Sequence, residues 1–299
     1  MQKKINTLPS KKLARNILVD FWHSFRQNKG ALIGLGIICF FIFIAIFAPL
    51  LTPHDPNKIH EGKYLVPPFW MEGNLSQFFL GTDDLGRDLL SRLLYGARFS
   101  VGLGFLVTIF SMITGTLIGL LSGYHGGIVD SIIMRIMDIL MSLPSILLAI
   151  VVVAILGPNM INAVIAVSII KIPSFVRLVR ASVLVEKEKD YIIASASFGA
   201  GGLRQVFVNI FPNCLAPLII QSTLAFSDGI LDIAALGFLG LGAQPPTSEW
   251  GTMLVNAKSF FITTPWFVTM PGVCILLVVL GFNLLGDGLR DALDPRLRK

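Results

Sequence analysis

The chain has 299 residues, of which 54% are apolar and only 14% are charged. A soluble domain usually carries about 25% charged residues, so this composition excludes an ordinary soluble protein. The formal net charge of +6 does not indicate nucleic acid binding, because the sequence holds no DNA- or RNA-reading motif. We therefore expect an all-α, multi-pass membrane protein in contact with lipid, whose basic residues set its orientation.

Residues 1–30 are basic and amphipathic, with Lys12, Arg15 and Arg26 placed around an apolar stripe. This pattern predicts a cytoplasmic segment that lies on the inner membrane surface or packs on the protein's own cytoplasmic face. The apolar run 31–51 is close to the ~20 residues that cross a bilayer core. We predict the first transmembrane helix there, and not a cleavable signal peptide, because the run is long enough to span.

Residues 52–98 are polar and contain several prolines, and we expect them to form a periplasmic loop. Thr82, Asp83 and Asp84 are favourable helix N-cap residues, and leucines follow them at a spacing of four. This pattern predicts a short amphipathic helix over 82–98.

Five more spans are predicted within 99–287, which gives six in all. The second, 101–121, carries Gly115, Gly119 and Gly123, whose spacing of four predicts close packing of another helix. The other four are expected at about 139–156, 160–179, 214–240 and 266–285. An even number of spans, with basic residues before the first and in the tail 288–299, places both termini in the cytoplasm.

Four polar residues inside the predicted spans are candidates for a translocation pathway: Asp138, Gln221, Asp228 and Asp232. Ionisable groups within a membrane are costly and usually face a cavity or a partner, and Asp228 and Asp232 share one helical face. The alternative is that the acids cap broken helices or pair with basic groups of a neighbouring chain. Lys171 interrupts the fourth span and is expected to extend towards the cytoplasm.

The segment 186–213, between the fourth and fifth spans, is expected on the cytoplasmic side. It begins with charged residues, continues with small residues that end at Gly199, and closes with a second helical stretch before Pro212. A helix, a glycine break and a second helix make a compact docking surface. We expect a partner protein to bind here.

The full sequence lacks the phosphate-binding pattern G-x-x-x-x-G-K-[ST] and the hydrolase patterns H-E-x-x-H and G-x-S-x-G. ATP hydrolysis, other catalysis and a cofactor are therefore not expected in this chain. Its three cysteines are far apart, without metal-ligand spacing, so neither a metal site nor a disulfide framework is expected.

The stretch Ala194-Ser195-x-x-x-Gly199, with Pro212 thirteen residues after the glycine, resembles the EAA loop of the permease subunits of bacterial ABC importers. The sequence departs from the family pattern at Ile193, where the family has Glu, at Ser195, where it has a second Ala, and at Phe211, where it has Leu. Further stretches resemble the peptide and nickel branch, and within it the C-type permeases of dipeptide import systems. They are 28–31 with 47–50, 80–92, 235–246 and 283–295.

This resemblance implies a type I ABC importer permease in the bacterial inner membrane, with 99–287 as the permease domain. It implies that Ala194, Ser195, Gly199, Ala200 and Pro212 couple the chain to an ATPase subunit. The implied partners are a homologous B-type permease, two ATP-binding subunits that bind ATP and Mg, and a periplasmic peptide-binding protein.

Dipeptides are the first choice of cargo, with oligopeptides, nickel chelates and antimicrobial peptides as alternatives. An alternative from another class is a proton-coupled secondary transporter. That class should carry internal repeats of its spans, and none is convincing here.

Overall fold

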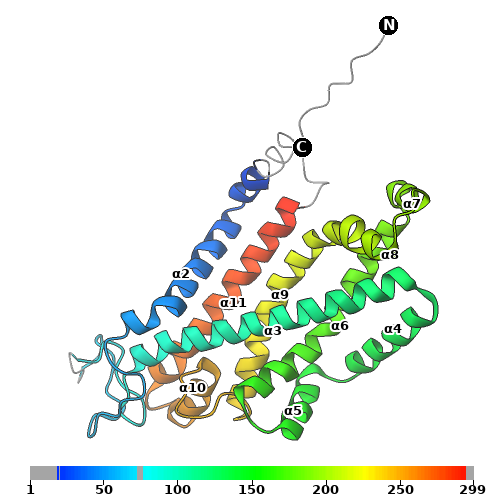
Figure 1. Cartoon of the computed structure of the whole chain (residues 1–299). Helices are drawn as coiled ribbons and strands as arrows, with labels where there is room; N and C mark the ends of the chain where they lie inside the picture. Colours follow the sequence, from blue (N-terminus) through cyan, green and yellow to red (C-terminus); the bar gives the residue numbers. More distant parts are fainter. Residues whose placement is uncertain (1–18, 20, 73–76, 294–299) are drawn as a thin grey trace.

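The computed structural model describes residues 19, 21–72 and 77–293, and the regular structure within these ranges is helical, apart from one isolated β-bridge between Thr82 and Asp88 (Figure 1). The numbered elements are α2 (Lys29–Leu51), α3 (Leu89–His125), α4 (Gly127–Ser142), α5 (Ser145–Leu156), α6 (Met160–Lys187), α7 (Asp190–Ser197), α8 (Gly202–Arg204), the π-helix η1 (Gln205–Ile210), α9 (Phe211–Phe238), α10 (Trp250–Ala257), the 3-10 helix η2 (Lys258–Phe260) and α11 (Pro265–Leu293). The predicted all-α fold class is confirmed.

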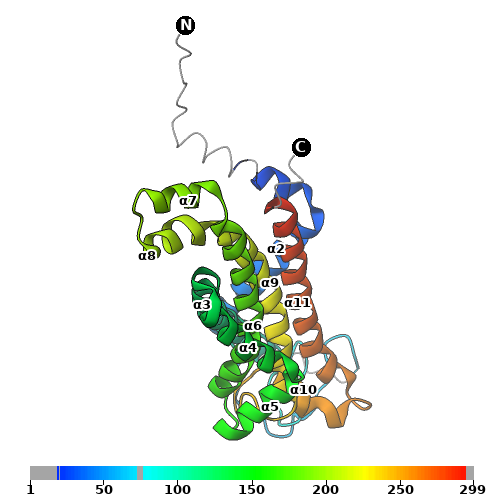
Figure 2. The same ribbon diagram turned by 90° about the vertical axis from the view of Figure 1, so that its right-hand side faces the viewer.

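The long helices run between two ends that carry different segments, and Figures 1 and 2 agree on this arrangement. The end that we call the α7 end holds α7, α8, the start of α2 and the close of α11. The opposite end, the α10 end, holds α10 and the segment between α2 and α3. The segment expected to dock a partner therefore lies at the same end as the start of the first span and the close of the last.

Among the described residues, five helical runs are long and apolar enough to cross a membrane: α2, α3, α6, Gly202–Phe238 and α11. A sixth candidate is the pair α4 and α5, which is bent by 95° at a short break. The break falls at Pro144, and Leu143 before it is extended, as a residue that precedes proline prefers to be. The six predicted spans correspond to these six candidates.

Several predicted boundaries differ from the structure. Helix α3 begins at Leu89, so most of the predicted helix over 82–98 and the second span form one helix, and α4 begins at Gly127, before the predicted start of the third span.

Two helices also continue past the predicted ends of their spans. Helix α6 continues to Lys187, well past the predicted end near Val179. Helix α11 continues to Leu293, so the predicted tail begins inside a helix. Both extensions carry polar residues, which a helix tolerates outside the apolar layer of the membrane. Hydropathy marks the end of the apolar run and not the end of the helix.

The prediction that a helix begins at Thr82 is wrong, because α3 begins at Leu89. Asp88 is its N-cap, and its Oδ2 accepts a hydrogen bond from Ser91 N at 3.0 Å. Asp83 is used differently: its buried carboxylate lies 2.6 Å from Arg87 Nε and 3.4 Å from Arg92 Nε. Asp83 neutralises two buried guanidinium groups within the turn that precedes α3. The helix starts after this turn.

The predicted amphipathic segment 1–30 lies largely outside the described residues. The part that is described is helical over 21–27. Phe25 there is buried against Ala31 and Ala292, at the close of α11. This contact favours packing of that part on the protein's own helices.

The predicted glycine contact face is formed by α3 against α6. A Cβ atom at Gly115 would lie 2.4 Å from Phe175 Cβ, and one at Gly123 would lie 2.8 Å from Val183 Cβ. These positions lack side chains where the two helices cross most closely. The glycines therefore set the distance between α3 and α6, as predicted.

Replacing Gly119 by leucine is expected to prevent this approach, because a Cβ atom there would lie 2.8 Å from both the Val176 carbonyl oxygen and Val179 Cβ. Overpacking of this kind costs about 1–3 kcal/mol or more, so we expect a severalfold loss of folded subunit. Gly102→Leu is the matched control, because it lies in the same helix and a Cβ there meets nothing within 4 Å among the described residues. Equal yields of both variants from detergent extracts would show that the helices can separate without loss.

Candidate functional site

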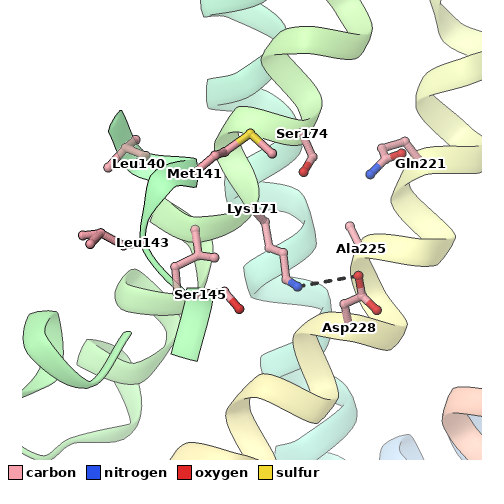
Figure 3. A pocket seen from close by; sticks show the side chains of 10 residues that line it. Leu140, Met141, Leu143, Ser145, Lys171, Ser174, Gln221, Ala225 and Asp228 are labelled. Carbon is pink, nitrogen blue, oxygen red and sulfur yellow. Dashed lines mark ion pairs between the residues drawn. The ribbon is translucent and has the colours of Figure 1, made fainter. Parts of the chain in front are cut away.

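Two features of the described chain are candidates for function: a charged cavity between the long helices and the exposed surface at the α7 end. The cavity is centred on Lys171 of α6, which faces α9 (Figure 3). Its Nζ lies 2.8 Å from Asp232 Oδ2 and 3.6 Å from Asp228 Oδ2. The three charged side chains lie between two apolar helices, where isolated charges would be costly.

This arrangement corrects two predictions. Lys171 does not extend towards a membrane surface, because two carboxylates on the facing helix neutralise it. Asp228 and Asp232 do share a face, as predicted, but they pair with a lysine of their own chain. The sequence held the necessary signal, since one cation and two acids at similar depth in neighbouring spans favour mutual pairing.

The cavity has a volume of about 290 Å³. Ten residues line it: Leu140, Met141, Leu143, Ser145, Ile170, Lys171, Ser174, Gln221, Ala225 and Asp228. The break between α4 and α5 supplies one wall, α6 supplies a second and α9 a third. Pro144 interrupts the helix between α4 and α5, and the backbone bends there. This bend leaves room for the cavity.

The structure separates the four predicted pathway residues. Gln221 and Asp228 line the cavity. Asp232 lies beside it as the nearer partner of Lys171. Asp138 lines none of it and pairs with Arg177 at 2.6 Å on the exposed surface of α4 and α6. Gln221 and Asp228 therefore lie together at the cavity, and Asp138 lies apart from them.

A second ionic contact joins α4 to α6 nearer the α7 end. Arg180 Nε and Nη2 donate to the two carboxylate oxygens of Asp130 at 2.5 and 2.6 Å. Ser122 Oγ of α3 donates to the same carboxylate at 2.5 Å. A bidentate guanidinium pair is geometrically rigid, so α3, α4 and α6 are fixed to one another beneath the α7 end.

At the α7 end, α7 and η1 are held against each other by hydrogen bonds. Tyr191 donates to Glu186, at the close of α6, and accepts from Asn213 Nδ2 at 2.9 Å. Asn209 Nδ2 donates to Ser195 Oγ at 2.9 Å. Desolvation and the neighbouring Glu186 carboxylate raise the pKa of Tyr191 to about 12, so its hydroxyl remains a donor at neutral pH.

The surface of this end carries several exposed apolar side chains. The side chains of Phe198 and Leu203 are 92% and 79% exposed, and Ile193 and Val208 are exposed as well. Between α7 and α8 the chain turns at Gly199, whose φ of +83° is a conformation that favours glycine. An exposed patch of large apolar side chains on a polar-rimmed loop is typical of a protein contact.

The five predicted coupling residues all belong to this region. Ala194, Gly199 and Pro212 are exposed, whereas Ser195 and Ala200 are partly covered. Sequence reasoning missed Phe198 and Leu203 as the largest exposed apolar groups, although both stand beside the glycine break. It also missed the hydrogen bond between Tyr191 and Glu186, because that contact joins residues on separate helices.

Within the described part of the chain, no group of three or more His, Cys, Asp or Glu residues has the arrangement needed to hold a metal ion. The charged cavity contains a lysine between two carboxylates, which suits an organic ion better than a metal.

Two family models match parts of the chain. Residues 115–299 match the family described as "Binding-protein-dependent transport system inner membrane component", and residues 17–68 match the "N-terminal TM domain of oligopeptide transport permease C". A chain of the MetNI methionine ABC transporter, solved in inward-facing conformations, shares the fold with a TM-score of 0.55. Its sequence identity is 20%, and the match covers 69% of this chain and 98% of that one.

Several curated proteins are similar over almost their full length. The di/tripeptide transport system permease protein DppC of Pseudomonas aeruginosa is 54% identical over 94% of this chain and 93% of its own. The dipeptide transport system permease protein DppC of Escherichia coli K12 is 55% identical over 94% of both chains. The glutathione transport system permease protein GsiD of Pectobacterium atrosepticum is 44% identical over 93% of this chain and 91% of its own.

Proposed function

We propose that this chain, which belongs to the inner-membrane components of binding-protein-dependent transport systems, is the C-type permease of an ATP-driven importer of dipeptides. The observation that carries the proposal is identity of 54–55% to dipeptide permeases over nearly the whole length. The 44% identity to a glutathione permease is lower, although glutathione is a peptide of similar size. The chain is thus a multi-pass inner-membrane permease, and dipeptides are the cargo that we assign to it.

The apolar patch at the α7 end supports a role in energy coupling. In the proposed complex, a homologous B-type permease lies beside this chain, two ATP-binding subunits bind ATP and Mg, and a periplasmic binding protein delivers the peptide. Closure of the ATP-binding subunits would move α7, which Tyr191 joins to Glu186 of α6 and to Asn213 of α9. Movement of α6 relative to α9 would then change the charged cavity between them.

The cavity between α4, α5, α6 and α9 is proposed as part of the translocation pathway. It places Gln221 and Asp228 in open space, and we assign them to contacts with the passing peptide. Asp232 has a supporting role as the counter-ion of Lys171. Asp138 is not included, because its partner Arg177 holds it outside the cavity.

Reconstitution of the full transporter in liposomes tests this function. Import of a labelled dipeptide is expected to require ATP, the binding protein and both permeases. Import driven by a proton gradient without ATP would contradict the proposal and favour the secondary transporter. Preference for glutathione over dipeptides by the cognate binding protein would keep the class and overturn the cargo.

We also propose that the α7 end is cytoplasmic and the α10 end periplasmic. Single cysteines introduced at Asn57 and Thr247, both towards the α10 end, should react with an impermeant thiol reagent added to intact spheroplasts. A cysteine at Ser197, in α7, should react only after lysis. The background for all three carries Cys39→Ser, because Cys39 is exposed. The reverse labelling pattern would invert the orientation.

A further inference from the structure

We propose that Asp228, with Gln221 and Ser174, forms a subsite for the α-ammonium group of a small peptide in transit. The inference rests on the proposed function and adds to it the chemical group that the cavity recognises. The residues come from two helices, α6 and α9, and Figure 3 shows them around one open space.

The charges of the cavity do not balance. Lys171 supplies one positive charge, whereas Asp228 and Asp232 supply two negative charges. Asp232 is the nearer partner, at 2.8 Å against 3.6 Å, and its side chain is 22% exposed against 64% for Asp228. The uncompensated negative charge is therefore carried by Asp228, on the side that faces the cavity.

Two more polar side chains in the lining lack partners of their own. Gln221 and Ser174 make no hydrogen bond to any described residue through their side chains. Gln221 lies two helical turns from Asp228 on the same face of α9. A carboxylate, an amide oxygen and a hydroxyl can all accept hydrogen bonds, and an ammonium group has three donors and no acceptor.

The net charge and the volume of the cavity limit which ligands it can bind. A net negative cavity at membrane depth attracts a cation, and the amine of Lys171 is already engaged by Asp232. The volume of about 290 Å³ lies just below the range of about 300–1,000 Å³ for small-molecule sites. A free amino terminus of a dipeptide or tripeptide meets both limits, whereas a long peptide exceeds the second.

Import by the reconstituted transporter gives the first test. At a dipeptide concentration below saturation, Asp228→Asn is expected to lower the rate of uptake about tenfold, because a charge-assisted contact is lost. Asp228→Glu should retain most uptake. Asp138→Asn is the matched control, because Asp138 is also an exposed acid within a span but lies outside the cavity. Stimulation of ATP hydrolysis by loaded binding protein should be equal in the parent complex and in Asp138→Asn.

A binding measurement without the binding protein gives the second test, because that protein also selects peptides. In a complex with Cys39→Ser and Cys274→Ser, a cysteine at Ser174 is labelled with a small maleimide. A millimolar dipeptide with a free amine is expected to slow labelling severalfold, and the same dipeptide with an acetylated amine is not. Asp228→Asn should remove the protection.

Equal protection by both peptides, or by neither, would overturn the ammonium subsite. So would unchanged uptake in Asp228→Asn. These outcomes are distinct from failure of the proposed function, in which the parent complex itself would show no ATP-dependent import of the dipeptide.

Discussion

Gly199→Arg is expected to abolish import and to reduce ATP hydrolysis stimulated by the binding protein at least tenfold, while the subunit reaches the membrane in normal amounts. Within this chain the substitution meets no obstacle, because a Cβ atom at Gly199 has no neighbour within 4 Å among the described residues. The positive φ costs about 1–2 kcal/mol locally. The large effect arises at the proposed interface, where a guanidinium group would be buried among apolar contacts without a partner.

Gly240→Arg provides a matched control for this prediction. Gly240 also has a positive φ, of +75°, and a Cβ atom there also meets nothing within 4 Å in the described structure. It follows α9 at the other end of that helix, so it carries the same backbone strain without the proposed contact. Retention of the ATPase subunits on the purified complex should fall in Gly199→Arg only. A similar loss in both variants would assign the effect to backbone strain.

The spans and the docking segment could be predicted because each follows from local sequence. A run of about twenty apolar residues has few alternatives to a membrane helix, and the α3 glycines reveal a contact face by spacing alone. Gly199 likewise marks a turn, because its backbone has a positive φ that favours glycine. These features depend on one stretch of chain at a time.

The charged cavity could not be derived in the same way, because its parts come from three separate spans. Pro144 predicts a break in the third span, but the bend of 95° depends on how α4 and α5 pack. The pairing of Lys171 with α9 depends on the rotation of two helices about their axes. The role of Asp83 is similar: its spacing suits an N-cap, and its burial beside Arg87 and Arg92 makes it an ion-pair partner instead.

Lys171→Met is expected to lower the yield of folded complex severalfold, and the pattern of rescue should identify the partner of Lys171. The substitution leaves Asp232 without a counter-ion at a position where its side chain is only 22% exposed. Removing one member of a fully buried pair costs about 3–5 kcal/mol, and partial exposure of this pair reduces our expectation to about 1–3 kcal/mol.

A second substitution in the same chain separates the two carboxylates. Lys171→Met with Asp232→Asn should restore the yield, because the least exposed charge is then gone. Lys171→Met with Asp228→Asn should not, because Asp228 is 64% exposed and tolerates the loss of its more distant partner. The measurement is the monodisperse fraction of the detergent-solubilised complex on size-exclusion chromatography, followed by its unfolding temperature. If both double variants recover equally, Lys171 neutralises the two acids as a shared pair, and Asp228 does not carry the unpaired charge.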